Sequence, residues 1–309
     1  FILECLRSNM VKPFLCLTGG AGTGKTTLVN MLQELVDPRT DNEQNLPNTI
    51  RDLAVFAYDA WLPSFGNISK ISSVMSDALC RLSTGGGFRT RKLYSDTENI
   101  VLKLQRPVIL NGINDFVEKQ DLLDRCLFIQ TVPFEDEQRK SESDLCREFR
   151  DKLPLLLGFI YDAMSKALWN LDKVKPDFKS RMMDFIRLGC AIEKGLKWSN
   201  GKFRTAFESN REDSINSNLE DDGVVTAIRC FMAKTKKWQG STTDLLNKFS
   251  TLKSVSQTPI PATSKGLSEH LKRIAPLIKE LGYNITLPSR VTWDKKNNRS
   301  IRQVTIIKE

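Results

Sequence analysis

The sequence predicts an α/β fold in which the core is followed by a helical segment and a separate basic domain. Three observations lead to this prediction. An apolar run at 14–17 passes through a glycine-rich turn into a helical repeat of leucines. Helical periodicity then dominates the chain after Pro133. Finally, residues 223–309 hold 16 lysines and arginines against 5 acids, a net charge of +11 in a chain whose total is +9. The expected domains are 1–135, 136–222 and 223–309.

The charge asymmetry and the composition restrict the possible functions. The whole basic excess lies in the C-terminal part, a distribution typical of a segment that contacts a polyanion; the alternative is a solvated basic surface. Seven cysteines are scattered singly with no C-x-x-C pair, which argues against a disulfide framework and a zinc site. His270 is the only histidine, so histidine-based catalysis is disfavoured.

The chain shows no sign of membrane insertion or export. No apolar run approaches the roughly 20 residues needed to cross a bilayer, and the first residues lack the features of a signal peptide. We therefore expect a cytoplasmic protein with no membrane partner. Because the first residue is Phe1 and opens an amphipathic pattern, we also expect the chain to be part of something longer.

The turn after the first apolar run matches the pattern G-x-x-x-x-G-K-[ST]. Glycines in such a turn let backbone N–H groups close around phosphates, and the following helix N-terminus adds partial positive charge. Lys25 would neutralise the β- and γ-phosphates of ATP, and the Thr26 hydroxyl would ligate Mg²⁺. The predicted nucleotide-binding residues are Gly19, Gly20, Ala21, Gly22, Thr23, Gly24, Lys25, Thr26 and Thr27.

A phosphate-binding turn of this kind usually works with an acid at the end of a second strand. One apolar run, at 53–60, ends at Asp59, whereas a second run, at 61–67, ends at Gly66 and Asn67 with no acid. The pattern favours Asp59, and Pro63 does not forbid a strand in the second run. Both candidates therefore stay open.

Two further residues have types found in oligomeric ATPases. Asn111 ends the apolar run 106–112 and has the amide side chain that orients an attacking water or contacts the γ-phosphate. Arg125 lies on a short helical segment before another apolar run and could reach a neighbouring subunit's nucleotide as an arginine finger. A lone helical arginine is otherwise a common surface ion pair.

These residues belong to a recognisable pattern. The segments "RDL", "NIS" and "SDALCRLSTGGGF", followed by "RPVILNGI" and "DLLDR", resemble the AAA+ type ATPases of phage and mobile-element replication proteins, which are kin to superfamily 3 helicases. The resemblance extends to the C-terminal "LSEHLKRIAPLIKELG". It implies a P-loop AAA+ (ASCE) core, a helical lid or collar, a C-terminal winged helix, and a homo-oligomeric ring, expected to be a hexamer. Such ATPases are often joined to an N-terminal primase-polymerase.

The resemblance also assigns roles and shows one departure. Lys25 and Thr26 take the Walker A roles, Asn111 the sensor 1 role and Arg125 the finger role. The family places its Walker B acid directly before N-[LI]-S, at the position of Gly66 in this chain. This departure has three possible meanings. Metal binding is weakened, Asp59 or another carboxylate takes the role of the missing acid, or ATP hydrolysis is slow. Asn67 and Asp59 remain site candidates.

A basic hairpin is expected at residues 84–104, where superfamily 3 helicases insert a hairpin into the channel of the ring. Alternation places Arg89 and Arg91 on one face, and Phe88, Lys92 and Tyr94 on the other. Cations would follow the phosphates of single-stranded DNA while an aromatic side chain stacks on a base. The alternative is an ordinary hairpin with a solvated basic face.

The remainder predicts helices and a C-terminal DNA-binding domain. Helices are expected at 137–152, 154–171, 178–194 and 202–217, and then at 224–234, after Ser241 and at 264–281, with strands near 283–287 and 302–307. This order indicates a winged helix-turn-helix for duplex DNA, or alternatively for protein contact. The predicted DNA contacts on the third helix and the wing are Lys265, Lys272, Lys279, Lys295 and Lys296.

Two hypotheses follow for function. The first is an ATP-dependent DNA helicase or replication ATPase that translocates on single-stranded DNA as a ring. The second is a nucleotide-gated DNA-binding assembly factor with weak hydrolysis, in which Gly66 leaves nucleotide binding intact.

Overall fold

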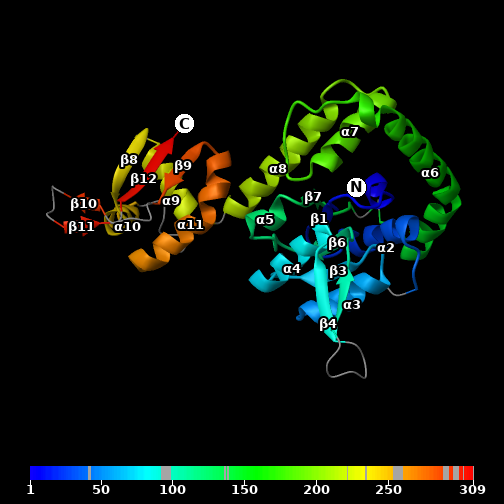
Figure 1. Ribbon diagram of the computed structural model, residues 1–309, viewed down its shortest axis with the longest axis horizontal. Coiled ribbons are helices and arrows are strands. Elements are labelled where there is room, and N and C mark those ends of the chain that lie inside the picture. The colour runs from blue at the N-terminus through cyan, green and yellow to red at the C-terminus, as the bar shows by residue number, and fades with distance from the viewer. Residues whose placement is uncertain are drawn as a thin grey trace. The chain divides into compact units, whose positions relative to one another are not determined.

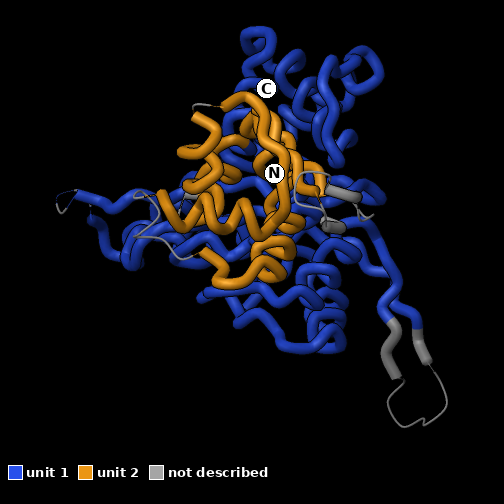
Figure 2. The backbone as a smooth tube through the Cα atoms, turned by 90° about the vertical axis from the view of Figure 1, so that its left-hand side faces the viewer, with its two compact units in different colours: residues 1–211 blue, residues 212–309 orange. Residues whose placement is uncertain are grey.

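The computed structural model of the chain comprises two compact units, residues 1–211 and 212–309 (Figure 2). The division between the units falls inside helix α8, Lys202–Glu220. The structure describes all residues except 41–42, 92–98, 136, 138, 221, 234, 253–259, 288–291, 295–298, 302 and 309. Among the described residues no helix is long and apolar enough to cross a membrane.

A five-stranded parallel sheet forms the centre of the first unit (Figure 1). The strand order is β2-β3-β6-β1-β7. Strands β1 and β6 read as continuous apolar runs because both faces of the sheet are covered, and nearly all of their residues are buried. The strands are β1 Phe14–Thr18, β2 Gln44–Asn45, β3 Ser64–Ile68, β6 Val108–Gly112 and β7 Cys126–Gln130.

Helices α1 and α2 pack on one face of this sheet through leucine, valine and cysteine side chains. The helices around the sheet are α1 Ile2–Cys5, α2 Lys25–Val36, α3 Ile50–Asp59, α4 Ser73–Thr84 and α5 Gln120–Leu123.

The expected strand at 53–60 is wrong, because this segment is helix α3. Thr49 caps the helix by accepting a hydrogen bond from the Asp52 backbone N–H, 3.1 Å away. Leu53, Ala54 and Ala57 then lie buried on one helical face. The strand is instead the next apolar run, which holds Gly66 and Asn67.

The expected hairpin is confirmed as an antiparallel pair, β4 Gly87–Arg91 and β5 Asn99–Lys103. Its two ends are attached to the end of α4. At the start, the Gly86 N–H donates to the Arg81 carbonyl, 2.8 Å; at the exit, the Arg106 N–H donates to the Leu82 carbonyl, 3.2 Å, and Gln105 Nε2 donates to the Ser83 carbonyl, 3.2 Å.

The helical segment contains α6 Glu142–Asn170, the short helix η2 Leu171–Lys173, α7 Met183–Gly195 and α8. The expected break at Pro154 is wrong, because α6 runs through it. Proline removes one backbone donor and leaves the carbonyl of Arg150 without its helical partner. Both residues are exposed, so water can satisfy that carbonyl.

The described residues of the second unit include the last part of α8, three further helices and an antiparallel sheet of order β8-β12-β9. The predicted helices and the two predicted strands are present. Strand β8, polar and containing glycine, was not predicted. The elements are α9 Gly223–Met232, β8 Lys237–Ser241, α10 Thr242–Ser250, α11 Ser264–Glu280, β9 Tyr283–Thr286, β10 Thr292–Asp294, β11 Arg299–Ile301 and β12 Gln303–Lys308.

Helix α11 is the amphipathic helix that the sequence predicts. Leu267, Leu271, Ile274 and Ile278 are buried, and the helix continues through Pro276. Asp222 caps α9 by accepting from the Val224 and Val225 N–H groups and also contacts His270 Nε2 on α11, 2.7 Å away. Burial alone would raise the pKa of Asp222, but His270 and the two N–H groups together lower it below its usual value.

Candidate functional site

The glycine-rich turn between β1 and α2 has a backbone that only glycine adopts readily. Gly19, Gly22 and Gly24 have φ values of 142°, 75° and 78°. A Cβ at Gly19 would lie 2.3 Å from Thr131 Oγ1 and 2.5 Å from the Thr131 carbonyl oxygen. Gly20, Ala21 and Gly22 are exposed, so the middle of the turn faces solvent. The middle of the turn can therefore offer its backbone to a ligand, while Gly19, the first residue, is confined by Thr131.

Lys25, the first residue of α2, folds back over this turn. Its Nζ donates to the carbonyl oxygens of Gly19, 2.8 Å, and Gly20, 2.7 Å. Thr26 is exposed and Thr27 half-buried in the same helical turn. An ammonium group and an exposed hydroxyl thus lie at the helix N-terminus, where the helix dipole favours an anion.

Thr131, just after β7, holds the turn from the neighbouring strand. Its Oγ1 donates to the Thr18 carbonyl, 3.0 Å, and lies 2.7 Å from Thr23 Oγ1, which also donates to the Gly20 carbonyl, 2.9 Å. No local sequence pattern marks Thr131, because it is distant in the chain and meets the turn only through the pairing of β7 with β1.

Asn111 lies on the strand next to β1, and its backbone is in register with Leu17. The side chain is 4% exposed. Its Nδ2 donates to Glu43 Oε1, 2.9 Å, and its Oδ1 has no hydrogen-bond partner among the described residues. A buried amide oxygen of this kind is an acceptor available to a bound water or ligand.

Strand β3 ends in an irregular segment, as its register with β6 shifts between Phe65 and Ile68. Asn67 is exposed with a φ of 55°, and Gly66 is buried. A Cβ at Gly66 would lie 2.3 Å from both Cδ and Oε2 of Glu43. Glu43 immediately precedes β2 and was not predicted as a site residue. No local pattern marks it, because it reaches Gly66 only through the pairing of β2 with β3.

Asp59, the acid favoured by the sequence pattern, is at the end of helix α3. Its carboxylate is 74% exposed and forms an ion pair with Arg39 Nη2, 2.6 Å. It is not brought to the end of a sheet strand, because the segment that carries it is helical.

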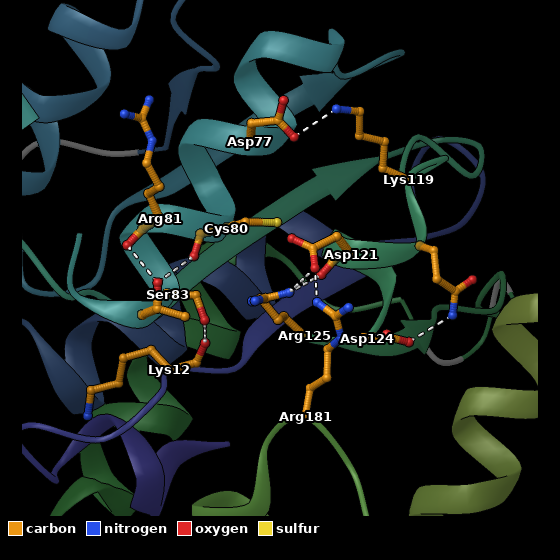
Figure 3. Close-up of polar contacts among 12 residues, drawn as sticks. Lys12, Asp77, Cys80, Arg81, Ser83, Lys119, Asp121, Asp124, Arg125 and Arg181 are labelled. Atoms are coloured by element: carbon orange, nitrogen blue, oxygen red, sulfur yellow. Dashed lines mark hydrogen bonds and ion pairs between the residues drawn. The ribbon is translucent and has the colours of Figure 1, made fainter. Parts of the chain in front are cut away.

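Arg125 lies in a cluster of charges on its own chain (Figure 3). Its side chain is 12% exposed, and Nη1 lies 3.0 Å from Asp121 Oδ1. Arg181 contacts Asp121 and also lies 3.2 Å from Asp124, and Arg211 lies 2.9 Å from Asp124. A finger role for Arg125 would require Asp121 to release it.

The predicted DNA-contacting residues are distributed over both units. Arg89 and Arg91 are in strand β4, and Lys265, Lys272 and Lys279 are exposed on α11. Lys92, Tyr94, Lys295 and Lys296 lie outside the described residues. Phe88 cannot stack on a base in this arrangement, because it is 1% exposed and lies beneath the guanidinium of Arg81, 5.4 Å from its ring centre.

The cysteines offer no nucleophile near the sheet. None of the seven, all of which lie among the described residues, forms a disulfide, and Cys5, Cys16, Cys80 and Cys126 are buried. Burial raises the pKa of Cys5 to about 12, and burial together with the adjacent Cys16 raises the pKa of Cys126 well above its usual value.

Several solved structures are similar to this chain at low identity. The X-ray structure of JCV helicase is 18% identical over 69% of this chain and 59% of that chain, with a TM-score of 0.34. The NrS-1 C terminal region (305–718) is 13% identical over 99% of this chain and 70% of that chain, with a TM-score of 0.39. This chain thus spans 59% of the JCV helicase chain. Scores this low carry no argument about function. No curated protein matches the chain.

Two family models match the chain. The model described as "Actinomycete integrative conjugative element replication protein" matches residues 1–211, and "AICE RepA C-terminal domain" matches residues 224–309. The first match ends where the first compact unit ends. The expected class, a replication protein of a mobile element, is confirmed, and the chain belongs to the family of actinomycete integrative conjugative element replication proteins.

Proposed function

We propose that this replication protein is a P-loop ATPase of the AAA+ type that couples ATP hydrolysis to translocation on DNA. The observation that carries the proposal is the glycine-rich turn between a central parallel strand and a helix, with Lys25 held over it by two carbonyl oxygens. A turn built this way is a site for the phosphates of a nucleotide.

The residues around the turn suit a magnesium-bound nucleotide. The exposed Thr26 hydroxyl is an oxygen ligand of the kind Mg²⁺ prefers. The Glu43 carboxylate and the buried Asn111 amide supply further oxygen atoms, and they are hydrogen-bonded to each other across β3. Magnesium, when bound, neutralises charge that develops on the β- and γ-phosphate oxygens.

In ATP hydrolysis, Lys25, the glycine-rich turn and Asn111 would have separate roles. Lys25 exchanges its contacts with the Gly19 and Gly20 carbonyls for phosphate oxygens, and the turn's N–H groups hold the β-phosphate. Asn111 Oδ1 accepts a hydrogen bond from the attacking water and orients it. The water oxygen bonds to the γ-phosphorus as the bond to the bridging oxygen breaks, and the proton that the water loses passes to a γ-phosphate oxygen, giving ADP and inorganic phosphate.

DNA contact is proposed for both units. The hairpin β4–β5 carries Arg89 and Arg91 and would follow the phosphates of a single strand in a ring of identical subunits. The helix and strand order of the second unit, with exposed lysines on α11, supports a winged helix that binds duplex DNA. Arg125 is proposed as the finger to a neighbouring subunit, once Asp121 releases it.

The test is DNA-stimulated ATP turnover and strand displacement. Lys25→Ala is expected to reduce turnover by about 10²-fold or more, because it removes a charge that stabilises the transition state. Lys175→Ala, at an exposed position, is the matched control. If native protein and Lys25→Ala bind and hydrolyse ATP equally, the proposal is wrong.

A second candidate function is a nucleotide-gated DNA-binding assembly factor. The observation that favours it is Gly66, because the strand position expected to carry an acid carries none. Tight ATP binding with DNA affinity that depends on nucleotide, but without turnover, would support this candidate over the motor.

A further inference from the structure

We infer that Glu43 is the carboxylate that serves the nucleotide site in place of an acid at position 66. The inference rests on the proposed function and assigns a metal-positioning residue to that site. Glu43 accepts a hydrogen bond from Asn111 Nδ2, 2.9 Å, and its carboxylate reaches the space beside Gly66.

The first argument is volume. A Cβ built on Gly66 meets Glu43 Cδ at 2.3 Å, Oε2 at 2.3 Å and Cγ at 2.8 Å. The Glu43 carboxylate therefore occupies the place of the first side-chain carbon that an acid at position 66 would have. Two acids cannot both fill this space, so a glycine at 66 is the condition for Glu43 to be there.

The second argument is orientation. Asn111 is 4% exposed, and its amide fixes one oxygen of Glu43, so Oε2 remains for another partner. Asn111 is in register with Leu17, one residue before Thr18 and the glycine-rich turn. Glu43 is thus held, through one amide, on β6, the strand that pairs with the one leading into that turn.

The third argument concerns how Glu43 reaches this place. Glu43 precedes β2, whose residues Gln44 and Asn45 pair in parallel with Phe65 and Gly66. An edge strand of two residues thus brings an acid from a different part of the chain to the end of β3. There the Glu43 carboxylate would help to hold a magnesium ion at the nucleotide site, by accepting hydrogen bonds from the ion's water.

The experiment measures how binding of a fluorescent, non-hydrolysable ATP analogue to the full chain depends on Mg²⁺ concentration, together with ATP turnover. Glu43→Gln keeps the volume and an oxygen that can accept from Asn111 but removes the charge. We expect the Mg²⁺ concentration for half-maximal binding to rise, and turnover to fall, by about 10- to 100-fold. Asp172→Asn, at a side chain that is 93% exposed, is the matched control. A Glu43→Gln protein that equals the native chain in both readouts overturns the inference.

Moving the carboxylate provides the second arm. Gly66→Asp alone places two carboxylates in contact and should impair both readouts, whereas Gly66→Asp in a Glu43→Ala background should recover most of the loss of Glu43→Ala. A double variant that folds, judged by circular dichroism, but is no better than Glu43→Ala overturns the inference.

The same data separate the two proposals. If the native chain binds the analogue and Lys25→Ala does not, while the Glu43 variants behave as native, the inference about Glu43 fails and the proposed function stands. If the native chain and Lys25→Ala bind the analogue equally poorly at every Mg²⁺ concentration, both fail.

Discussion

The glycine-rich turn after β1 and the end of β3 belong to one sheet but are built in different ways. The turn is formed by consecutive residues, and the Thr131 backbone lies so close to Gly19 that a Cβ there would clash with it. The end of β3 is completed by Glu43, a side chain from a distant segment, whose flexible end lies against Gly66. The comparison shows that two glycines with equally close neighbours can leave room for different groups: a backbone carbonyl in one case, and a side-chain carboxylate in the other.

The largest effect should come from Gly19→Ala. Its Cβ would lie 2.5 Å from a carbonyl oxygen, at a φ of 142° that alanine rarely adopts. We expect a loss of about 2–4 kcal/mol in the free energy of unfolding, measured with urea, because neither backbone can move away cheaply. A loss below that of Gly66→Ala would contradict the contrast between the two glycines.

A smaller effect is expected for Thr131→Val, which keeps the shape but removes the hydroxyl that joins the Thr18 carbonyl to Thr23. The expected loss is about 1 kcal/mol, because hydrogen bonds to the turn are removed. The matched change in β3 is Ser64→Ala at the first residue of the strand, since the buried Ser64 Oγ has no partner among the described residues. That variant should be neutral or slightly stabilised in the same urea titration.

Gly66→Ala should change stability less than it changes metal dependence. The atoms it meets belong to the end of the Glu43 side chain, which can rotate away by giving up its hydrogen bond to Asn111, so the expected loss is about 1 kcal/mol. The displaced carboxylate should nevertheless raise the Mg²⁺ requirement of nucleotide binding. A large loss in the free energy of unfolding, together with an unchanged Mg²⁺ requirement for nucleotide binding, would contradict this difference between Gly66 and Gly19.

The smallest effect is expected for Asp59→Asn. Its partner is Arg39, and an exposed ion pair of this kind contributes about 0.2–1 kcal/mol. Turnover and Mg²⁺ dependence should stay at the native level, whereas Glu43→Gln should change both. A fall in turnover for Asp59→Asn alone would instead favour the acid that the sequence pattern selects.

The sequence predicts best where one local pattern determines the structure. The run from Phe14 to Val36 was predicted because strand, turn and helix follow one another without a gap. The hairpin and helix α11 were predicted for the same reason, from alternation and from a helical apolar stripe. Helix α3 was mistaken for a strand, although Thr49 and Asp52 form a readable N-terminal cap.

The site residues that the sequence missed depend on tertiary pairing. Thr131 reaches the turn through the register of β7 with β1, and Glu43 reaches Gly66 through the register of β2 with β3. A single sequence contains no local signal for either register, because β2 is two residues long. The helix break predicted at Pro154 was wrong for another reason. A solvent-exposed helix can lose one backbone hydrogen bond and remain continuous.

The attachment of the hairpin has a mechanical consequence. Both of its ends are hydrogen-bonded to Arg81, Leu82 and Ser83 at the end of α4, so neither end provides an independent hinge. The hairpin and the end of α4 are therefore tied together, and the chain that leaves β5 continues into β6, where Asn111 lies. In the proposed motor, these links would join movement of the hairpin to movement of the residues at the nucleotide site.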